Sequence, residues 1–390
     1  MRNVENALNL QPVDAMLFKM PTSSADDLPS ALVLPHLRTL EAYTPGHQPG
    51  DGPWIKLNTN ENPYPPSPQV AEAIRAVLAE DRLRRYPDPR SMALRETLAA
   101  FYGLEAGQVL VGNGSDDVLN LLIRTFADPR QRTVLTVPSY SLYPVLLNIQ
   151  NGTSRPVPFT RDMKLPVDAL LANPDATAES LLLLTSPNAP TGVAFPNEEL
   201  RRLAAGFPGL LVVDEAYGEF APETAIDLLG EFPRLAVTRS FSKTYGLAGL
   251  RLGYLLGHPD LIDRVDRLRD SYNVNLLSQA GGVAALQDRA YYTDVIQKIL
   301  ATRDAFSAWC ASQNWFTYSS ATNFVFTEPR KQGATGKEVA RDAFRWLEKN
   351  RILVRSFPSH PLTESFLRIT VGREEEMVTV QEVLKAWLET

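Results

Sequence analysis

Lys243 lies between two small hydroxyl residues in the segment RSFSKTYGLAGLRLG, residues 239–253, and Arg251 follows eight positions later. A lone lysine is almost always a solvated surface residue. The alternative is a reactive amine that bonds covalently to a carbonyl compound. The glycines after the lysine allow a tight turn under either interpretation. Their spacing does not match a dinucleotide-binding loop, so the role of Lys243 depends on what the rest of the chain brings beside it.

Residues with useful chemistry also follow several short apolar runs. The runs TVLTV, LLLLT, LLVVD and LAVT, at residues 133–137, 181–185, 210–214 and 235–238, predict strands, and QVLVGNGSDD predicts a strand, a glycine turn and a helix start. The residues that come after these runs are Gly114, Ser115 and Asp116 in the glycine turn, then Tyr140, Asn188, Asp214 with Tyr217, and Lys243. Continuous apolar runs are typical of central parallel strands covered on both faces. Because ligands bind at the carboxyl ends of such strands, we expect these residues to meet at one edge of a sheet.

Each of these residues also has an ordinary structural interpretation. GNGS is more often a plain turn, and Tyr140 would usually pack in a core. Asn188 between prolines is typical of a turn, and Asp214 at a strand end is commonly a helix cap. The combination is harder to explain in this way, because five strand ends that carry complementary chemistry are an improbable accident.

Pyridoxal phosphate has a chemical requirement for each of these groups. Its aldehyde needs a lysine amine to form a Schiff base, and its ring nitrogen needs a carboxylate that keeps the ring protonated as an electron sink. Its phenolate oxygen needs donors such as a tyrosine hydroxyl and an asparagine amide. Its phosphate needs backbone N–H groups, hydroxyls and an arginine, and its ring face suits an aromatic side chain. The residues therefore predict a site for this cofactor.

The motifs also carry a family resemblance. DEAYGEF, SFSKTYGLAGLRLGY, SPNAPTG, NENPYPPSP, RYPDP and RITVG resemble the fold-type I pyridoxal-phosphate aminotransferases, in particular their histidinol-phosphate aminotransferase branch. The resemblance covers roughly residues 35–390 and is more specific for the cofactor class than for the substrate. Ser186 and Ala189 replace asparagines that are more common in the family, and Ser240 stands where threonine is frequent, but Asn188 is retained.

The resemblance implies a role for each residue of the cofactor site. Lys243 would hold the cofactor as a Schiff base and act as the base, with Asp214 on the pyridinium nitrogen and Tyr217 as a further catalytic residue. Tyr217 and Asn188 would hydrogen-bond the phenolate oxygen, and Tyr140 would stack on the ring. The phosphate would be held by Ser240, Ser242, Arg251 and the backbone of Gly114, Ser115 and Asp116. Tyr64 would reach the phosphate of the neighbouring subunit's cofactor, which implies a homodimer.

Two arginines near the C-terminus are candidates for substrate binding. Arg368 alternates with aliphatic residues in FLRITVG, so a strand would place it on the face opposite the aliphatic set. Arg355 ends the run RILVRS. Both could equally be solubilising charges on edge strands. The resemblance makes Arg368 the fork for the substrate α-carboxylate and Arg355 the candidate for a distal group such as a phosphate.

Other residues could complete the substrate pocket. The resemblance implies that Tyr43, in EAYTPG, lies in a segment that closes over the substrate side chain, and that Asn188 also contacts the substrate. Tyr272, Asn273 and Asn275 in YNVN either line the same pocket or form a structural turn.

The elements that must position these residues indicate an α/β fold. Strand-like and helix-like segments alternate through the middle of the chain, which predicts a mostly parallel central sheet covered by helices. After about residue 280 a long helical stretch leads to further strand candidates and a terminal helix. We expect an N-terminal extension of unknown role over residues 1–34, a segment packing near the active site over 35–57, a large cofactor-binding domain over 58–280, and a smaller α+β domain over 281–390.

Composition restricts the partners and the compartment. The net charge of −6 gives no reason to expect a nucleic acid or an anionic membrane surface as a partner. No apolar run reaches the roughly 18 residues of a transmembrane helix, and the first thirty residues lack the basic region and apolar core of a signal peptide. The single cysteine, Cys310, excludes an intrachain disulfide and fits the cytoplasm. The four histidines include no pair at metal-ligand spacing, so we expect no metal.

The expected activity is transamination of the histidinol-phosphate type, with 2-oxoglutarate and glutamate as the other substrate pair and ping-pong kinetics through Lys243. An aromatic amino acid aminotransferase and a threonine-phosphate decarboxylase are alternatives that keep the cofactor. A non-catalytic protein that keeps the fold is a third hypothesis, but it would be expected to have lost Lys243, Asp214 or Arg368, and all three are present.

Overall fold

The computed structural model describes residues 32–42, 46–173 and 178–390. The chain divides into two compact units, residues 1–40 and 41–390. In the first unit the structure describes a short 3-10 turn at Pro35–Leu37. Most of the predicted N-terminal extension, and also Tyr43, lie outside the described residues. The second unit contains all the helices and strands named below.

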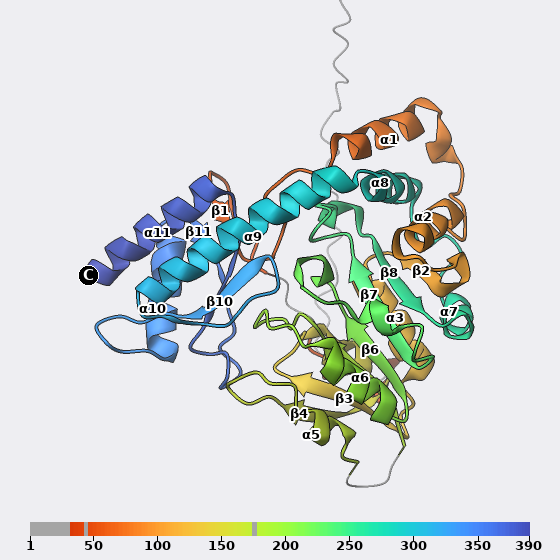
Figure 1. Ribbon diagram of the computed structural model, residues 1–390, viewed down its shortest axis with the longest axis horizontal. Coiled ribbons are helices and arrows are strands. Elements are labelled where there is room, and N and C mark those ends of the chain that lie inside the picture. The colour runs from red at the N-terminus through yellow and green to blue at the C-terminus, as the bar shows by residue number, and fades with distance from the viewer. Residues whose placement is uncertain (1–31, 43–45, 174–177) are drawn as a thin grey trace, which may run out of the picture. The chain divides into compact units, whose positions relative to one another are not determined.

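A seven-stranded sheet of order β2-β8-β7-β6-β5-β3-β4 forms the centre of this unit (Figure 1). Its strands are β2 (Val109–Gly112), β3 (Arg132–Val137), β4 (Thr153–Pro158), β5 (Glu179–Thr185), β6 (Leu210–Asp214), β7 (Leu235–Ser240) and β8 (Gly253–Gly257). β8 is antiparallel to both of its neighbours, and the other neighbouring pairs are parallel. The predicted mostly parallel sheet is therefore confirmed. The sequence pattern predicts neither β8, a short run between glycines, nor β4, which contains two prolines and no apolar run.

The middle of each central strand is apolar because both faces of the sheet are covered. Successive side chains of a strand point to opposite faces. Leu182 and Leu184 of β5 accordingly join one core cluster, whereas Leu181 and Leu183 join a second cluster. Burial of apolar side chains stabilises the fold by roughly 1.5–3 kcal/mol for each large residue. A charge placed on either face would therefore be costly, and the chemistry must lie at the ends of the strands.

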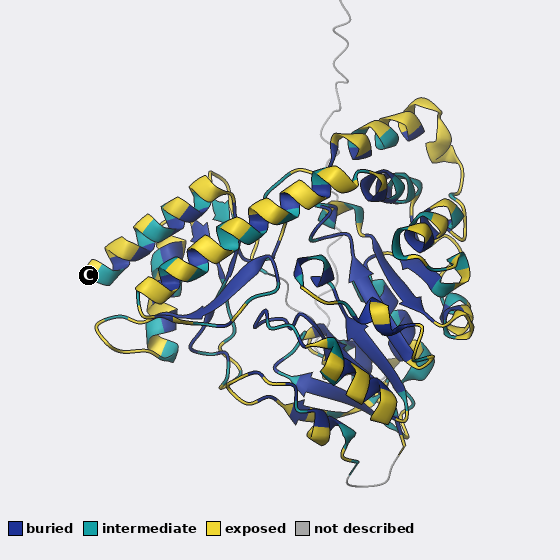
Figure 2. Cartoon of the chain, viewed as in Figure 1, coloured by how far each residue is buried: buried dark blue, intermediate teal, exposed yellow. Residues whose placement is uncertain are grey.

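Helices cover each face and leave the strand ends open. One face packs against α2 (Met92–Tyr102), α5 (Val167–Leu171), α6 (Asn197–Gly206) and α8 (Leu276–Gln287), and α1 (Pro68–Ala79) packs on α8. The other face packs against α3 (Ser115–Phe126), α4 (Leu142–Ile149) and α7 (Pro259–Asp266). Figure 2 shows the central strands β6, β7 and β8 as buried, with exposed residues along the outer side of α6 and of the long helix α9 (Arg289–Ser312).

A second, smaller sheet belongs to the C-terminal part of the chain. It is antiparallel, of order β12-β13-β10-β9, with β9 (Phe316–Thr317), β10 (Phe324–Glu328), β12 (Arg355–Ser356) and β13 (Leu367–Thr370). It shares a core with α9, α10 (Lys337–Lys349) and α11 (Glu374–Glu389). β1 (Ile55–Lys56) pairs in parallel with β11 (Ile352–Leu353), so the segment before residue 57 joins the C-terminal elements. The division into domains at residue 280 stays a prediction.

Candidate active site

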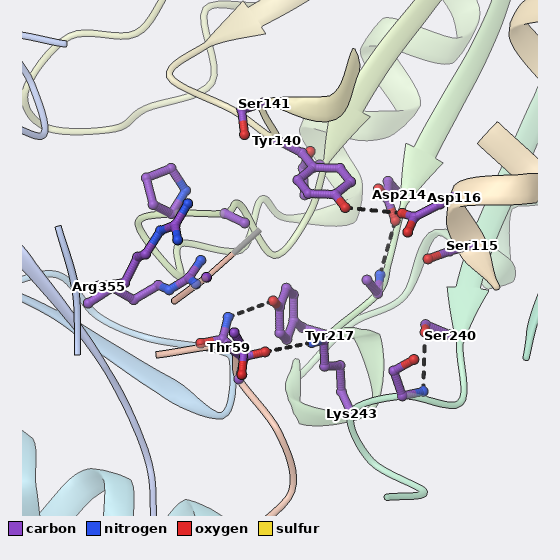
Figure 3. Close-up of a pocket in the computed structure, with 18 of the residues that line it drawn as sticks. Thr59, Ser115, Asp116, Tyr140, Ser141, Asp214, Tyr217, Ser240, Lys243 and Arg355 are labelled. Atoms are coloured by element: carbon purple, nitrogen blue, oxygen red, sulfur yellow. Dashed lines mark hydrogen bonds between the residues drawn. The ribbon is translucent and has the colours of Figure 1, made fainter. Parts of the chain in front are cut away.

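A cavity of about 260 Å³ lies at the carboxyl ends of the central strands (Figure 3). The residues predicted from the sequence that line it are Ser115, Asp116, Tyr140, Asp214, Tyr217, Ser240, Ser242, Lys243, Arg251, Arg355 and Arg368. They come from the ends of the central strands and from the smaller sheet. The expected meeting of these side chains at one edge of the sheet is thus what the structure shows.

Lys243 follows β7 and extends its amine into the cavity. Its Nζ donates a hydrogen bond to the backbone oxygen of Thr59 at 3.1 Å (Figure 3). Burial of the amine lowers the pKa of Lys243 to about 8, and the positive charge of Arg368 acts in the same direction. The neutral amine, which is the form that attacks a carbonyl compound, is therefore far more populated near neutral pH than on a surface lysine.

Asp214 is the last residue of β6 and is 4% exposed. Its Oδ2 accepts a hydrogen bond from the hydroxyl of Tyr143 at 2.8 Å, and its Oδ1 accepts one from Thr238 Oγ1 at 3.0 Å. Burial raises the pKa of Asp214 to about 6, although both hydrogen bonds favour the ionised form. A buried carboxylate of this kind is stabilised by a cation placed against it, such as a protonated ring nitrogen.

Tyr217, three residues after β6, presents a neutral phenol to the cavity. Burial raises the pKa of Tyr217, while the positive charge of Arg368 and a hydrogen bond from Asn60 limit the increase. The ring of Tyr217 packs edge-on against Phe324, with 5.3 Å between the ring centroids. The Nζ of Lys243 lies 5.8 Å from the Tyr217 centroid, so the phenol and the amine face the same space.

An anion-binding cradle forms where α3 begins. Gly114 precedes the helix with φ 94°, a conformation that favours glycine. A Cβ atom there would lie 2.7 Å from Nη2 of Arg251, so a side chain would require this guanidinium to shift. The carboxylate of Asp116 is held by the hydroxyl of Tyr140 at 3.0 Å and by Arg251 at 3.2 Å. The N–H groups of the first turn and the arginine together suit a phosphate.

Two serines after β7 lie beside this cradle. The backbone N–H of Ser242 donates to Ser240 Oγ at 3.2 Å (Figure 3). That bond uses Ser240 as an acceptor, so the hydroxyl proton remains to be donated. Both serines are buried, at 3% and 6% exposure, and both line the cavity.

Arg355 and Arg368 are direct partners across neighbouring strands. Arg355 of β12 pairs in register with Arg368 of β13, and both line the cavity. The Arg368 guanidinium also donates to the backbone oxygen of Asn58 at 3.1 Å and lies 5.2 Å from the centroid of Phe357. Like charges directly opposite each other destabilise a sheet. Because both guanidinium groups line the cavity, the pair favours anion binding over the alternative of solubilising edge charges.

Several of the site residues predicted from the sequence do not line the cavity. Asn188 is completely buried beside it, where its Nδ2 donates to the backbone oxygen of Pro138 at 3.3 Å and its Oδ1 accepts from Thr191 at 2.8 Å. Gly114 supports the cradle from behind, through its close approach to Arg251. Tyr64 lies elsewhere, with its ring 5.8 Å from the amine of Lys298.

The YNVN segment has structural contacts. Asn275 caps α8 by accepting from the N–H of Ser278, and Asn273 donates to the backbone oxygen of Val111. Tyr272 stacks on Tyr86 with 4.4 Å between the centroids. These contacts favour the structural alternative for the segment.

The structure adds site residues that sequence reasoning missed. Asn58, Thr59 and Asn60 line the cavity, and Tyr143 holds Asp214 from α4. Tyr143 could have been found, because it lies three residues after Tyr140, in the first turn of the helix that follows the predicted strand. No periodic pattern marks the segment 58–60, because its position depends on packing between distant parts of the chain.

No metal centre is evident within residues 32–42, 46–173 and 178–390, since no three His, Cys, Asp or Glu side chains there could hold an ion. Across the same described portion of the chain, no helix combines the length and apolar character needed to cross a membrane.

The donor set fits pyridoxal phosphate. The cavity offers one amine of lowered pKa, a buried carboxylate, a neutral phenol, and a cradle of backbone N–H groups beside an arginine and hydroxyls. The cradle favours glycine at position 114, because φ is 94° there and a Cβ atom would lie 2.7 Å from Nη2 of Arg251. Each functional group of the cofactor therefore has a chemical counterpart in the cavity.

Comparisons with known proteins agree with this chemistry. A family model described as aminotransferase class I and II matches residues 52–384. A histidinol-phosphate aminotransferase from Geotalea uraniireducens is 43% identical over 90% of this chain and 97% of its own, and one from Syntrophotalea carbinolica is 44% identical over 88% and 95%. The crystal structure of the Sinorhizobium meliloti histidinol-phosphate aminotransferase, in complex with pyridoxal-5'-phosphate, has a TM-score of 0.78 and 28% identity, and covers 85% of this chain and 91% of that chain.

Proposed function

The chain belongs to the class I and II aminotransferase family, and we propose that it is a pyridoxal-phosphate-dependent histidinol-phosphate aminotransferase. It interconverts histidinol phosphate and 2-oxoglutarate with imidazole-acetol phosphate and glutamate. The observation that carries this proposal is the meeting of Lys243, Asp214 and the Arg355–Arg368 pair in one cavity. The relatives of 43% and 44% identity, each matched over nearly its whole length, support the same substrates.

Different residues of the cavity would bind different functional groups of the cofactor. When bound, pyridoxal phosphate supplies an aldehyde that bonds to amines and a protonated ring that accepts electrons from the substrate. Lys243 would provide the amine of the protein, and Asp214 would accept the hydrogen bond of the ring nitrogen. Tyr217 would donate to the phenolate oxygen, and Tyr140 would pack against the ring. Ser240, Ser242, Arg251 and the start of α3 would hold the phosphate, and Asn188 would support the phenolate side from beside the cavity.

Asp214 and Lys243 provide the two proton-handling groups. Asp214 accepts hydrogen bonds from Tyr143, Thr238 and the backbone N–H of Ala216, so its carboxylate keeps one orientation and one lone pair of Oδ2 for the ring nitrogen. The free amine of Lys243 would take the proton from the substrate Cα and later return it. A lysine with a pKa of about 8 is suited to this exchange near neutral pH.

The arginine pair selects anionic substrates. Glutamate carries two carboxylates, and histidinol phosphate carries a phosphate, so both partners of a ping-pong cycle present negative charge. Arg368 provides a planar fork that matches a carboxylate, and Arg355 opposite it receives the distal anionic group. Closure of the pocket by Tyr43, which lies outside the described residues, is part of the same proposal.

The active unit is a cytoplasmic homodimer in this proposal. Tyr64 does not line the cavity of its own chain, which is compatible with a role at the cavity of a second copy. Its hydroxyl would there contribute to phosphate binding. Size-exclusion chromatography with light scattering tests the dimer, and a monomer with full activity would refute it.

A substrate panel tests the activity. Purified holoenzyme is mixed with histidinol phosphate, phenylalanine or threonine phosphate, and conversion of the bound cofactor to its amine form is followed by absorbance. Fast conversion with histidinol phosphate supports the proposal. Preference for phenylalanine would indicate an aromatic aminotransferase, and release of CO₂ from threonine phosphate would indicate a decarboxylase. Lys243→Ala serves as the control, and a variant with near-normal turnover would refute the role of Lys243.

A further inference from the structure

Asn60 connects the cofactor side of the cavity to the strand that carries Arg368. It is 1% exposed, and its Nδ2 donates to the hydroxyl oxygen of Tyr217 at 2.7 Å. Its backbone N–H donates to Thr370 Oγ1, and Thr370 Oγ1 donates to Asn60 Oδ1, both at 3.0 Å. Asn323 Nδ2 donates to the Asn60 backbone oxygen at 3.1 Å. Every polar group of Asn60 therefore has a buried partner.

The Asn60 amide lies between Thr370 and Tyr217. The hydroxyl of Thr370 has one proton, which it gives to Asn60 Oδ1, and the Thr370 oxygen accepts from the Asn60 backbone. In this arrangement the amide oxygen faces Thr370, and the amide nitrogen faces Tyr217. Because an amide nitrogen only donates, the Tyr217 oxygen must be the acceptor in that bond.

The proton of Tyr217 consequently remains available. Among the described residues, the bond from Asn60 is the hydrogen bond that the Tyr217 hydroxyl makes, and it uses the oxygen alone. The phenol is neutral, since burial raises the pKa of Tyr217. Tyr217 lines the cavity, so its O–H can be donated only toward the cavity or be left without an acceptor. A donor that accepts a hydrogen bond at the same oxygen is also polarised into a better donor.

The backbone at Asn60 is held in a conformation that most residues avoid. Its φ is 56°, in the left-handed region, which asparagine tolerates better than other residues with a side chain. Such conformations cost free energy, persist where the surroundings fix them, and concentrate at functional sites. Hydrogen bonds to Thr370 and Asn323 hold the Asn60 backbone in this conformation, and the amine of Lys243 donates a hydrogen bond to the backbone oxygen of the preceding residue, Thr59.

We propose that Asn60 is a positioning residue that directs the Tyr217 hydroxyl proton toward the phenolate oxygen of bound pyridoxal phosphate, with Thr370 fixing the orientation of the Asn60 amide. The inference rests on the proposed function, because it needs the cofactor in this cavity. Asn60 also connects the cofactor-binding residues to the substrate-binding strand, since Thr370 is two residues from Arg368 and lies on the same face of β13.

The test compares Asn60→Gly with the wild-type holoenzyme. Glycine accepts the left-handed backbone, so the change removes the side chain without adding strain at φ. Loss of the directed Tyr217 donor makes the phenolate oxygen more basic. The pH midpoint of the absorbance transition of the bound cofactor should therefore rise by about 0.5–1 unit. Titration of the apoprotein with pyridoxal phosphate should show affinity weakened about 3- to 10-fold, the usual range for one hydrogen bond.

Matched variants separate positioning from a general structural role. Asn323→Ala also removes a buried hydrogen bond to Asn60, but leaves its amide on Tyr217, and should move the midpoint by less than about 0.2 unit. In a Tyr217→Phe background, Asn60→Gly should have no further spectral effect, because the group it directs is gone. Thr370→Val should shift the midpoint in the same direction as Asn60→Gly, by less. It also serves as the test if Asn60→Gly fails to fold.

The outcomes that refute this inference differ from those that refute the proposed function. A wild-type protein that binds no pyridoxal phosphate would overturn both. A wild type that binds the cofactor and transaminates, with an unchanged midpoint and affinity in Asn60→Gly and Thr370→Val, would overturn the role of Asn60 alone. If the pH midpoint shifted equally in Asn323→Ala, the effect of Asn60→Gly would reflect a general structural role and not the positioning of Tyr217.

Discussion

Tyr143 should control catalysis through its hydrogen bond to Asp214. The carboxylate accepts from Tyr143 at 2.8 Å, from Thr238 at 3.0 Å and from the N–H of Ala216 at 3.3 Å. Tyr143→Phe removes the shortest of these bonds and keeps the buried ring. A hydrogen bond to a charged group contributes about 1.5–3 kcal/mol. Because Thr238 and Ala216 remain, we take about 1.4 kcal/mol, which corresponds to about one pKa unit or a tenfold change.

The sign follows from which form of Asp214 the bond favours. The bond from Tyr143 stabilises the carboxylate, so its removal raises the pKa of Asp214 further above its usual value. A less ionised Asp214 holds the proton of the cofactor ring less firmly, and the ring becomes a weaker electron acceptor. The rate at which glutamate converts the bound cofactor to its amine form should therefore fall about tenfold.

Stopped-flow absorbance of that half-reaction measures the effect. Thr185→Val is the matched control, because it removes the other hydroxyl that contacts Tyr143 at 2.8 Å and leaves the bond to Asp214 intact. It should change the rate by less than about twofold. A Tyr143→Phe rate within twofold of the wild type, with unchanged cofactor affinity, would refute the reasoning.

The charges of the site lead to three more expected outcomes. The rate at which the apoprotein binds pyridoxal phosphate, followed by absorbance, should rise about tenfold per pH unit and level off above pH 8. The reason is that only the neutral amine of Lys243 reacts, and the pKa of Lys243 is about 8. A rate that levels off only above pH 10 would contradict this. The pKa of Asp214 in the folded protein is about 6, above the ordinary value of 3.8. As the pH rises between these values, ionisation of Asp214 therefore lowers the free energy of unfolding of the apoprotein by up to about 3 kcal/mol. Urea unfolding should therefore find apo Asp214→Asn more stable than the wild type at pH 8 but not at pH 4, and an equal difference at both values would count against it. Arg368→Lys keeps the charge but loses the planar fork, so the KM for glutamate should rise about 10- to 100-fold with a smaller change in kcat; an unchanged KM would exclude Arg368 as the carboxylate site.

The strand ends were predictable because the end of an apolar run and the start of polar residues both mark the same position in the sequence. Runs such as 181–185 and 210–214 are apolar at every position but the last, which indicates strands covered on both faces, and the chain must leave the sheet where polar residues begin. Asp214 and Lys243 occupy those exits, and the structure places both in one cavity. The sequence pattern did not predict β4, because its prolines and polar residues suppress the strand pattern. It did not predict β8, because a run of only three residues between two glycines resembles a loop.

The sequence by itself determined the mostly parallel α/β fold and the chemical types around the cofactor, because both depend on local periodicity and on residues adjacent to strand ends. Only the tertiary structure decided how distant parts of the chain meet around the cavity. It paired Arg355 with Arg368 across strands, brought Asn60 onto Tyr217 and set Tyr143 on Asp214. These contacts join residues 13 to 157 positions apart. Their formation depends on packing of the whole chain, which no local pattern encodes. The lowered pKa of Lys243 has the same origin, since burial and the charge of a distant arginine produce it.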